Sequence, residues 1–466
     1  METAHTASRA SGGEMDHWEP LLDKLLAAFD GAMALQLPDG SASRFGNGDY
    51  VTEQPEFVLC LRDPHAVRSL LLGQDPLRFA DAYFRGAIDV EGDLFAALSL
   101  KDHLQALQLT WLDRLRVLGR LLSRGLALRS NWRTQLPAHL QAKVVRAHSR
   151  NENRQAISFH YDLSNDFYGL WLDDSMVYSC AYFEQAGMTL EQAQRAKLDH
   201  ICRKLQLQNG EMFLDIGCGW GALVLHAAQY YGVRAHGITL SERQFELARE
   251  RIRAARMEHL VTVELQDYRD MPGQARFDKI ASVGMFEHVG LKNLPQYFAT
   301  VHRLLKPEGF FLNHGITHDE EGWGEAISAR FINRYVFPDG ELDTVSNIQR
   351  AMERAQFEIL DVEGLRPHYA QTLRHWVHRL ERQHAAALQH VNESTYRVWR
   401  LYMAASALEF ESGGLGLYQI LSSPRGTDAR SLPRTRHYMY PQSGQGWRRA
   451  TAWPSLSADG GYSSTD

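Results

Sequence analysis

Residues 212–316 constrain the fold more than any other part of the chain, because apolar strands and helical stretches alternate along them. A short strand at residues 213–216 runs into the glycine-rich turn GCGWG at residues 217–221, and a helix of apolar period follows over residues 222–231. Glycines at such a turn let the backbone approach a ligand closely. Their G-x-G-x-G spacing differs from the G-x-G-x-x-G of dinucleotide binders.

Four further strands follow in the same alternation, at residues 233–240, 261–265, 277–284 and 309–316. Five strands alternating with helices predict a doubly wound parallel sheet of α/β class, whose ligands bind beyond the carboxyl ends of the strands. Polar side chains stand at or just after those ends, and we expect them to share one cleft. They are Asp215, Thr239, Asp267, Glu287 and His314.

With Asp215 just before it, the glycine turn resembles the first motif of class I S-adenosylmethionine (SAM)-dependent methyltransferases, which implies SAM as cofactor. The second strand, however, ends in Thr239 and Leu240, where these enzymes usually carry an acid for the cofactor ribose. Gln244 is the nearest group that could replace this acid. Ser241 is expected to cap the next helix, with Gln244 completing a capping box.

Composition excludes several classes of protein. The 466 residues are 44% hydrophobic and 23% charged, with a net charge of −6, which argues against wholesale disorder and against a globally basic nucleic-acid binder. The four scattered cysteines indicate a reducing cytoplasmic compartment rather than a disulfide scaffold. No run of 18 apolar residues occurs, so no membrane-spanning helix is expected.

We expect five parts along the chain. These are a disordered leader (1–16), a smaller α+β N-terminal domain (17–102), a basic helical linker (103–150), a catalytic domain (151–423) and a disordered tail (424–466). The linker carries nine Arg or Lys residues, one Asp and leucines at helical spacing. Such a helix can lie on an anionic membrane surface, but it can also be an inter-domain helix with a solvated basic face, and the pattern alone favours the second interpretation.

Longer motifs resemble one family. The segment SFHYDLSNDFYGLWLDDSMVYSCAYFE, followed by GITLSERQ, MFEHVG, FLNHGI and PHYAQTLRHW, resembles cyclopropane-fatty-acyl-phospholipid synthases and their mycolic acid methyltransferase relatives over roughly residues 145–422. Members of that family commonly carry a Thr at the end of the second strand, as this chain does. Residues 17–100, with DAYFRGAIDVEGDL, resemble the lipid-binding domain of the synthases.

The resemblance implies transfer of a methylene group from SAM to the cis double bond of an unsaturated phospholipid acyl chain. A cyclopropane forms through a carbocation that bound bicarbonate deprotonates. It also implies peripheral association with the inner face of the cell membrane. A lipid methyltransferase giving a methyl-branched or hydroxylated chain, a non-catalytic lipid-binding protein and a homodimer remain open, as does the preferred acyl chain.

Because an isolated alkene is a poor nucleophile, the reaction requires that the enzyme align the alkene with the methyl group of SAM and exclude water. It also requires an anion that stabilises the carbocation and accepts a proton from it. The resemblance assigns the bicarbonate site to Cys180, Glu287, His314, Tyr369 and the backbone of Ile316. It assigns the cofactor to Tyr178, Ser179, Asp215, Gly217, Gly219, Thr239, Leu240, Gln244, Asp267 and Tyr268.

Simpler interpretations of these residues exist. Without the resemblance, Cys180 is more readily explained as a buried thiol, and the aromatic residues around it as ordinary core. The spacing of the Cys, His and Glu residues matches no zinc pattern, so no metal is expected.

Overall fold

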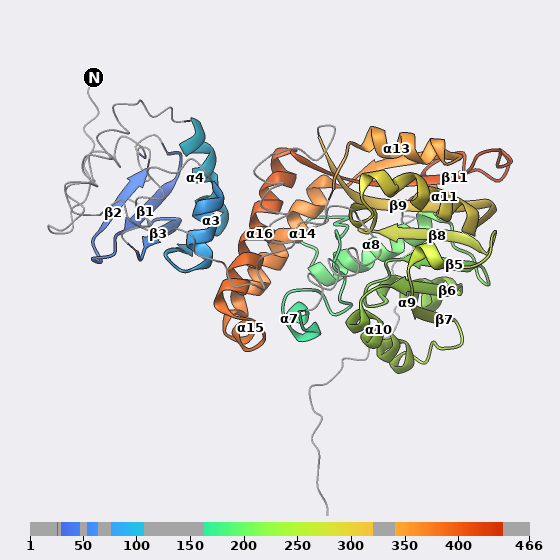
Figure 1. The fold of residues 1–466 in the computed structure, drawn as a ribbon, viewed down its shortest axis with the longest axis horizontal. Helices are drawn as coiled ribbons and strands as arrows, with labels where there is room; N and C mark the ends of the chain where they lie inside the picture. The colour runs from blue at the N-terminus through green and yellow to red at the C-terminus, as the bar shows by residue number, and fades with distance from the viewer. Residues whose placement is uncertain are drawn as a thin grey trace, which may run out of the picture. The chain divides into compact units, whose positions relative to one another are not determined.

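The computed structural model describes residues 26, 29–46, 54–63, 76–106, 163–319 and 341–440 (Figure 1). The chain divides into two compact units. The first comprises residues 1–144, 324–338 and 373–412, and the second comprises residues 145–323, 339–372 and 413–466. The expected leader, almost all of the basic linker and the last part of the tail lie outside the described residues.

A seven-stranded sheet with the order β10-β11-β9-β8-β5-β6-β7 forms the centre of the second unit. Its five parallel strands are those expected from the sequence: β5 (Met212–Ile216), β6 (Arg234–Thr239), β7 (Val261–Leu265), β8 (Phe277–Val283) and β9 (Leu305–His318). The doubly wound α/β fold is therefore confirmed. The sequence analysis missed β10 (Phe357–Gly364) and β11 (Leu415–Pro424), which extend the sheet in antiparallel fashion beyond β9.

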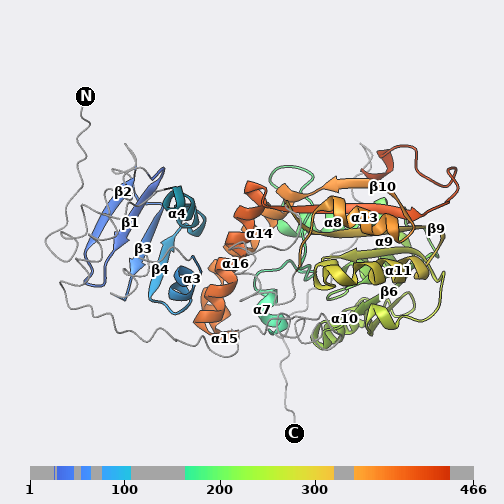
Figure 2. The ribbon, with the colours of Figure 1, turned by 45° about the horizontal axis from the view of Figure 1, so that its top comes forward.

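Helices cover both faces of this sheet (Figure 2). The core on one face joins α8 (Leu190–Lys204), α9 (Ala222–Tyr231) and α10 (Glu242–Ala254), and the core on the other joins α11 (Leu294–Leu304) and α13 (Val345–Arg354). Along β5 the side chains alternate between the two cores, as the period of a strand requires. Phe213 packs on the first core and Leu214 on the second, so Asp215 faces the α8 side.

The first unit contains a four-stranded sheet with the order β2-β1-β3-β4. Its strands are β1 (Ala32–Gln36), β2 (Ala42–Gly46), β3 (Phe57–Leu61) and β4 (Ile88–Gly92). The helices α3 (Pro76–Phe84) and α4 (Leu94–Ala106) pack on this sheet and on the long helix α16 (Glu393–Ser412). The presence of both strands and helices agrees with the α+β class expected for this region. The sequence analysis did not predict β2 and β4.

Helix α16 is joined to the N-terminal residues by two arginines. Arg397 donates to the carbonyl of Tyr83 at 3.0 Å and pairs with Asp89 at 3.1 Å. Arg400 donates to the Tyr83 hydroxyl at 2.9 Å and pairs with Glu381 at 2.7 Å. The end of α14 (Arg366–Arg382), α15 (His384–His390) and α16 thus belong with the N-terminal unit, which differs from the single catalytic domain expected over residues 151–423.

The chain after β11 packs on the second unit as far as residue 440. A short 3₁₀ helix, His437–Met439, brings Met439 into the core that contains α8 and α9, and its side chain is only 2% exposed. The carbonyl of Met439 lies 3.2 Å from Nδ1 of the buried His200. Residues 424–440 are therefore ordered, which corrects the expectation of a disordered tail from residue 424 onward.

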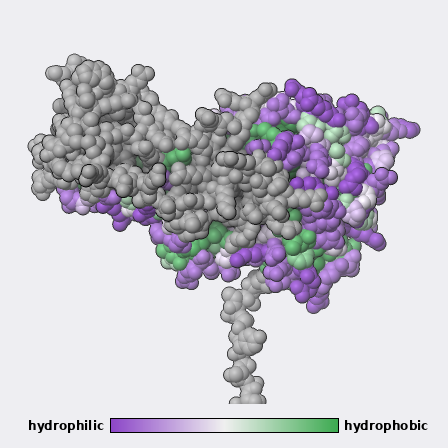
Figure 3. Space-filling view, in the orientation of Figure 1, coloured by the Kyte–Doolittle hydropathy of each residue, from purple (hydrophilic) through white to green (hydrophobic). Residues whose placement is uncertain are grey.

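The described surface on the face shown in Figure 3 is mostly hydrophilic, with separate small hydrophobic patches. Large hydrophobic side chains exposed among the described residues lie on or beside four different elements: Tyr230, Leu265, Leu388 and Tyr440. No helix within the described ranges combines the length and apolar character needed to cross a membrane.

Met439→Ala should destabilise the second unit by about 2 kcal/mol or more, because it removes a buried side chain from the core and leaves a cavity. His437→Ala, two residues away on an exposed position, is the matched control and should have little effect. Urea unfolding of both variants, followed by circular dichroism, measures the difference. Equal changes in the free energy of unfolding in the two variants would show that burial of Met439 does not stabilise the core.

Candidate active site

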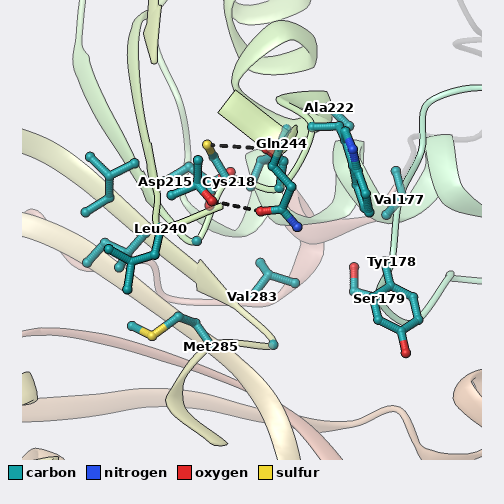
Figure 4. A pocket seen from close by; sticks show the side chains of 18 of the residues that line it. Val177, Tyr178, Ser179, Asp215, Cys218, Ala222, Leu240, Gln244, Val283 and Met285 are labelled. Atoms are coloured by element: carbon teal, nitrogen blue, oxygen red, sulfur yellow. Dashed lines mark hydrogen bonds between the residues drawn. The ribbon is translucent and has the colours of Figure 1, made fainter. Parts of the chain in front are cut away.

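A cleft opens at the carboxyl ends of β5, β6 and β8, and it gathers most of the residues assigned to the cofactor (Figure 4). In the close view Tyr178 and Ser179 lie across the cavity from Leu240. Nine of the ten assigned residues line the cleft: Tyr178, Ser179, Asp215, Gly217, Gly219, Thr239, Leu240, Gln244 and Tyr268. The sequence motifs, which are up to 90 residues apart, therefore converge on one place.

The glycine turn forms one wall of the cleft with a left-handed backbone. Gly219 has a φ of +54°, and a Cβ placed there would meet no protein atom within 4 Å, so a side chain would project into open space. Asp215 precedes the turn and is almost fully buried, and its Oδ1 has no hydrogen-bond partner among the described residues. Burial raises the pKa of Asp215 to about 7, against the opposing charge of Lys197.

Thr239 and Gln244 form a pair beside this turn. The Thr239 hydroxyl donates to Gln244 Oε1 at 2.8 Å, which leaves the amide nitrogen of Gln244 on the cavity side (Figure 4). Ser241 caps α10 as expected, since its hydroxyl accepts a hydrogen bond from the backbone N–H of Gln244 at 3.3 Å. The expected capping box is incomplete, because the Gln244 side chain turns to Thr239 instead of back to Ser241.

Asp267 is the one assigned cofactor residue that is not among those lining the cleft. Its carboxylate caps the 3₁₀ helix Tyr268–Asp270 and pairs with Arg269 at 2.6 Å. Gln266 and Tyr268, its two neighbours, do line the cleft, as does Arg269 itself. In this structure Asp267 therefore holds an arginine that lines the cleft and does not line the cleft itself.

Glu287 is hydrogen-bonded to Ile316 at the point where β9 extends beyond the end of β8. The last paired residues of these strands are Val283 and His314, so the amide of Ile316 extends beyond the end of β8. Glu287 Oε1 accepts from that amide at 2.7 Å, while Oε2 is buried without a partner among the described residues. Burial raises the pKa of Glu287, which favours its protonated form. The N–H of Ile316 thus orients Glu287.

His314 is oriented by Gln419 on β11. The amide nitrogen of Gln419 lies 3.0 Å from His314 Nδ1, and since an amide nitrogen only donates, Nδ1 accepts and the ring proton is on Nε2. Nε2 is buried without a partner in the described part of the chain. Burial lowers the pKa of His314 to about 3, so the ring is neutral at physiological pH.

Cys180 lies on the segment that the start of α14 covers. Its thiol is 3.1 Å from the carbonyl of Ala181, and burial raises its pKa, so it is a neutral thiol rather than a nucleophilic thiolate. The amide of Ala181 donates to Thr372 Oγ1 at 3.0 Å, which fixes this segment against α14. Tyr369 is half-buried on the same part of α14, between the residues that hold the segment.

The sequence analysis did not single out Lys197, Trp220, Arg269, Met285 and His288, all of which line the cleft. The sequence pattern around Lys197 could have identified it as an unusual buried lysine. Leu190, Ala193, Lys197 and Ile201 recur at helical spacing among the buried residues of α8, and a lysine in line with three apolar side chains is unusual.

A seven-stranded sheet with its ligand cleft at the switch between β5 and β8 defines the class I SAM-dependent methyltransferases. Residues 148–420 match the family model for mycolic acid cyclopropane synthetase, and the chain belongs to that family. This confirms the family expected from the motifs.

Individual relatives agree with this assignment. The chain is 39% identical over 412 residues to a probable fatty acid methyltransferase of Pseudomonas putida, covering 88% of this chain and 96% of the relative. It is 40% identical over 303 residues to the cyclopropane-fatty-acyl-phospholipid synthase of Escherichia coli K12, covering 64% and 76%. Mycolic acid cyclopropane synthase CmaA1, solved with SAH and CTAB, superposes with a TM-score of 0.56 at 34% identity, covering 58% and 98%.

Gly219→Val should abolish binding of S-adenosylhomocysteine measured by calorimetry, because the branched side chain would fill the space beside the turn. Gly210→Val is the matched control, since Gly210 also has a positive φ and open space around it but does not line the cleft. The control carries similar backbone strain and should keep its affinity. Wild-type affinity in Gly219→Val would place the cofactor elsewhere.

Proposed function

We propose that this chain transfers a methylene group from SAM to the cis double bond of an unsaturated acyl chain of a membrane phospholipid and so forms a cyclopropane ring. One observation carries the proposal beyond the family assignment. Glu287 Oε2 and His314 Nε2 are both buried without hydrogen-bond partners in the described part of the chain, and Glu287 is bonded to the amide of Ile316, two residues after His314 on β9. Buried polar atoms of this kind normally have a partner, which here would be a bound ligand.

The residues present fit the two small molecules that this reaction requires. The open space at Gly219 and the unpartnered Oδ1 of Asp215 suit SAM in the cleft. The donor on His314 Nε2 suits an anion such as bicarbonate, and the raised pKa of Glu287 favours the form in which its carboxyl group can donate as well. The Cys180 thiol and Tyr369 are further donors. When bound, SAM supplies an electrophilic methyl group and bicarbonate supplies a base.

The protein groups have separate roles in this proposal. A methyl group added to an alkene leaves a cation on the acyl chain, and ring closure requires a proton to leave the added carbon. His314 would donate from Nε2 and hold the proton acceptor in place, while Gln419 keeps the ring in that tautomer. Glu287, oriented by the Ile316 amide, would hold or release a proton at Oε2.

Aromatic rings beside the cleft can exclude water and tolerate positive charge. Tyr168 contacts Tyr178 and Trp220 with ring centroids 5.8 and 5.2 Å apart, and Trp171 contacts Tyr178 at 5.4 Å. Aromatic faces attract cations, so a wall of this kind suits both the sulfonium of SAM and a transient carbocation.

A second candidate is a fatty acid methyltransferase that leaves a methyl branch instead of a ring. The observation that favours it is the similarity to the Pseudomonas putida protein, which extends over 88% of this chain and carries that name. Both candidates share the cofactor cleft and the carbocation. The cation closes to a ring when the added carbon loses a proton, it gives a methyl-branched alkene when another carbon loses one, and a saturated branch needs a hydride from a separate reductant.

Cells expressing the wild-type chain should contain phospholipids whose unsaturated acyl chains have gained one CH₂ unit and lost the alkene, measured by mass spectrometry. Glu287→Gln and His314→Ala should lower product formation at least about a hundredfold, because each removes a group that positions or moves the proton. Both variants should keep their affinity for S-adenosylhomocysteine.

Glu358→Gln, the same change at an exposed position of β10, is the control and should behave as the wild type. Methyl-branched chains in cells expressing the wild type would favour the second candidate, and unchanged lipids would contradict both.

We further propose that the basic stretch at residues 103–150, most of which lies outside the described residues, docks the protein reversibly on anionic membrane. Each Lys or Arg near such a surface contributes about 1 kcal/mol, screened by salt. Replacing Arg114, Arg116, Arg120 and Arg124 with Gln should therefore weaken sedimentation with anionic vesicles and lower activity on them. Activity on detergent-dispersed lipid should fall much less. Equal losses on both substrates would indicate a structural role for these arginines.

A further inference from the structure

Lys197 is a buried cation in the wall of the cleft. Its side chain projects from the middle of α8, is only 2% exposed and lines the cleft together with Asp215. Nζ donates to Ser179 Oγ at 3.0 Å, directly before Cys180 in the chain. Since an ammonium group has three N–H donors, this bond leaves donors for other partners. Lysines are almost never fully buried without a partner of opposite charge, so its presence here requires an explanation.

The ionisable groups around Lys197 do not form a simple ion pair with it. Asp173 is committed to the backbone, since it accepts from the amides of Ser175 and Val177, both at 2.9 Å. Asp215 is the other carboxylate nearby, and burial raises the pKa of both acids. Burial lowers the pKa of Lys197 to about 8, so that it remains largely charged at neutral pH.

Among the described residues, by contrast, the groups assigned to the proposed anion site carry no positive charge. Besides Lys197, the buried Lys204 acts on His314, but it is paired with Glu363. The thiol of Cys180 and the ring of His314 are neutral, and Glu287 can only be neutral or negative. The charge of Lys197 acts on both Cys180 and His314, and because all three groups are buried, electrostatic effects extend further between them than in solution. An anion buried among these groups would otherwise lack a compensating positive charge.

We propose that Lys197 is the counter-charge that allows a small monovalent anion to bind among Cys180, Glu287 and His314. The inference rests on the proposed function, because it takes the anion to be bicarbonate. Lys197 is then a positioning residue that acts through the field and through Ser179, not a group that touches the reacting carbons. The competing explanation is that Lys197 only fixes the Ser179 segment for the cofactor.

The two explanations separate in a binding experiment that needs no turnover. Bicarbonate is titrated calorimetrically, in carbonate-depleted buffer, into protein saturated with S-adenosylhomocysteine. Lys197→Met keeps an unbranched side chain that is one atom shorter and removes the charge. It should weaken bicarbonate binding about tenfold or more, which corresponds to about 1.4 kcal/mol. Its affinity for S-adenosylhomocysteine should change less than about threefold, because the cofactor cleft keeps its other groups.

Lys279→Met is the matched control. Lys279 is also a buried lysine, but it lies near the start of β8, at the opposite end of the strand, with Nζ 4.0 Å from the centroid of the Phe310 ring. This change should leave bicarbonate affinity at the wild-type value. Lys197→Arg preserves the charge and should retain more affinity than Lys197→Met. If Lys197→Met does not fold, Lys197→Gln replaces it.

Competition by nitrate in the wild type adds a measurement that requires no variant. Nitrate is a planar anion of similar shape and should compete with bicarbonate if a buried cation creates the site, and its failure to compete would contradict the proposal. Unchanged bicarbonate affinity in Lys197→Met, or loss of S-adenosylhomocysteine binding alone, would overturn it in favour of the structural role. A wild type that binds no bicarbonate would also overturn it, and the lipid analysis would then decide the proposed function separately.

Discussion

Loss of water around the ionisable side chains at the carboxyl edge of the large sheet sets the protonation state of each of them. His314 loses its charge, Cys180 keeps its proton, and the pKa values of Asp215 and Glu287 rise. The neutral His314 and Cys180 can donate hydrogen bonds, and the raised pKa values of the two acids favour their protonated forms, which are poorer nucleophiles toward a carbocation than carboxylates. The same desolvation strengthens every electrostatic interaction in the site, which is why one buried lysine can matter to several neighbours.

The geometry that brings these groups together follows from unequal strand lengths. Because β9 continues past the end of β8, its backbone has a free amide at Ile316, and Glu287 supplies the acceptor that β8 no longer provides. On the other side β11 pairs with β9 and places Gln419 against His314. The antiparallel extension of the sheet thus orients one of the two central residues of the proposed anion site.

Of the five residues expected to share one cleft at the strand ends, Asp215 and Thr239 line it, whereas Asp267, Glu287 and His314 do not. Local patterns were sufficient to predict the five parallel strands, because each is encoded within about 20 residues. They were insufficient for β10 and β11, whose place depends on pairing across the sheet with strands distant in sequence. The same holds for α16, since Arg397 and Arg400 find their partners more than 300 residues away, near Tyr83. Gln419 and Lys197 were missed for a related reason, because their importance lies in what they face. Composition misjudged residues 424–440, where Met439, with Leu432 and Tyr438 packed beside it, anchors a polar segment on the core.

The central claim is that the carbon added from SAM loses a proton to a base as the ring closes. Purified protein supplied with SAM bearing a fully deuterated methyl group, and with vesicles of a monounsaturated phospholipid, tests this most directly by mass spectrometry and NMR of the product. The account predicts a cyclopropane ring that retains two of the three deuterium atoms, the third having been lost to the base. A methyl-branched alkene or alcohol that retains all three would contradict it.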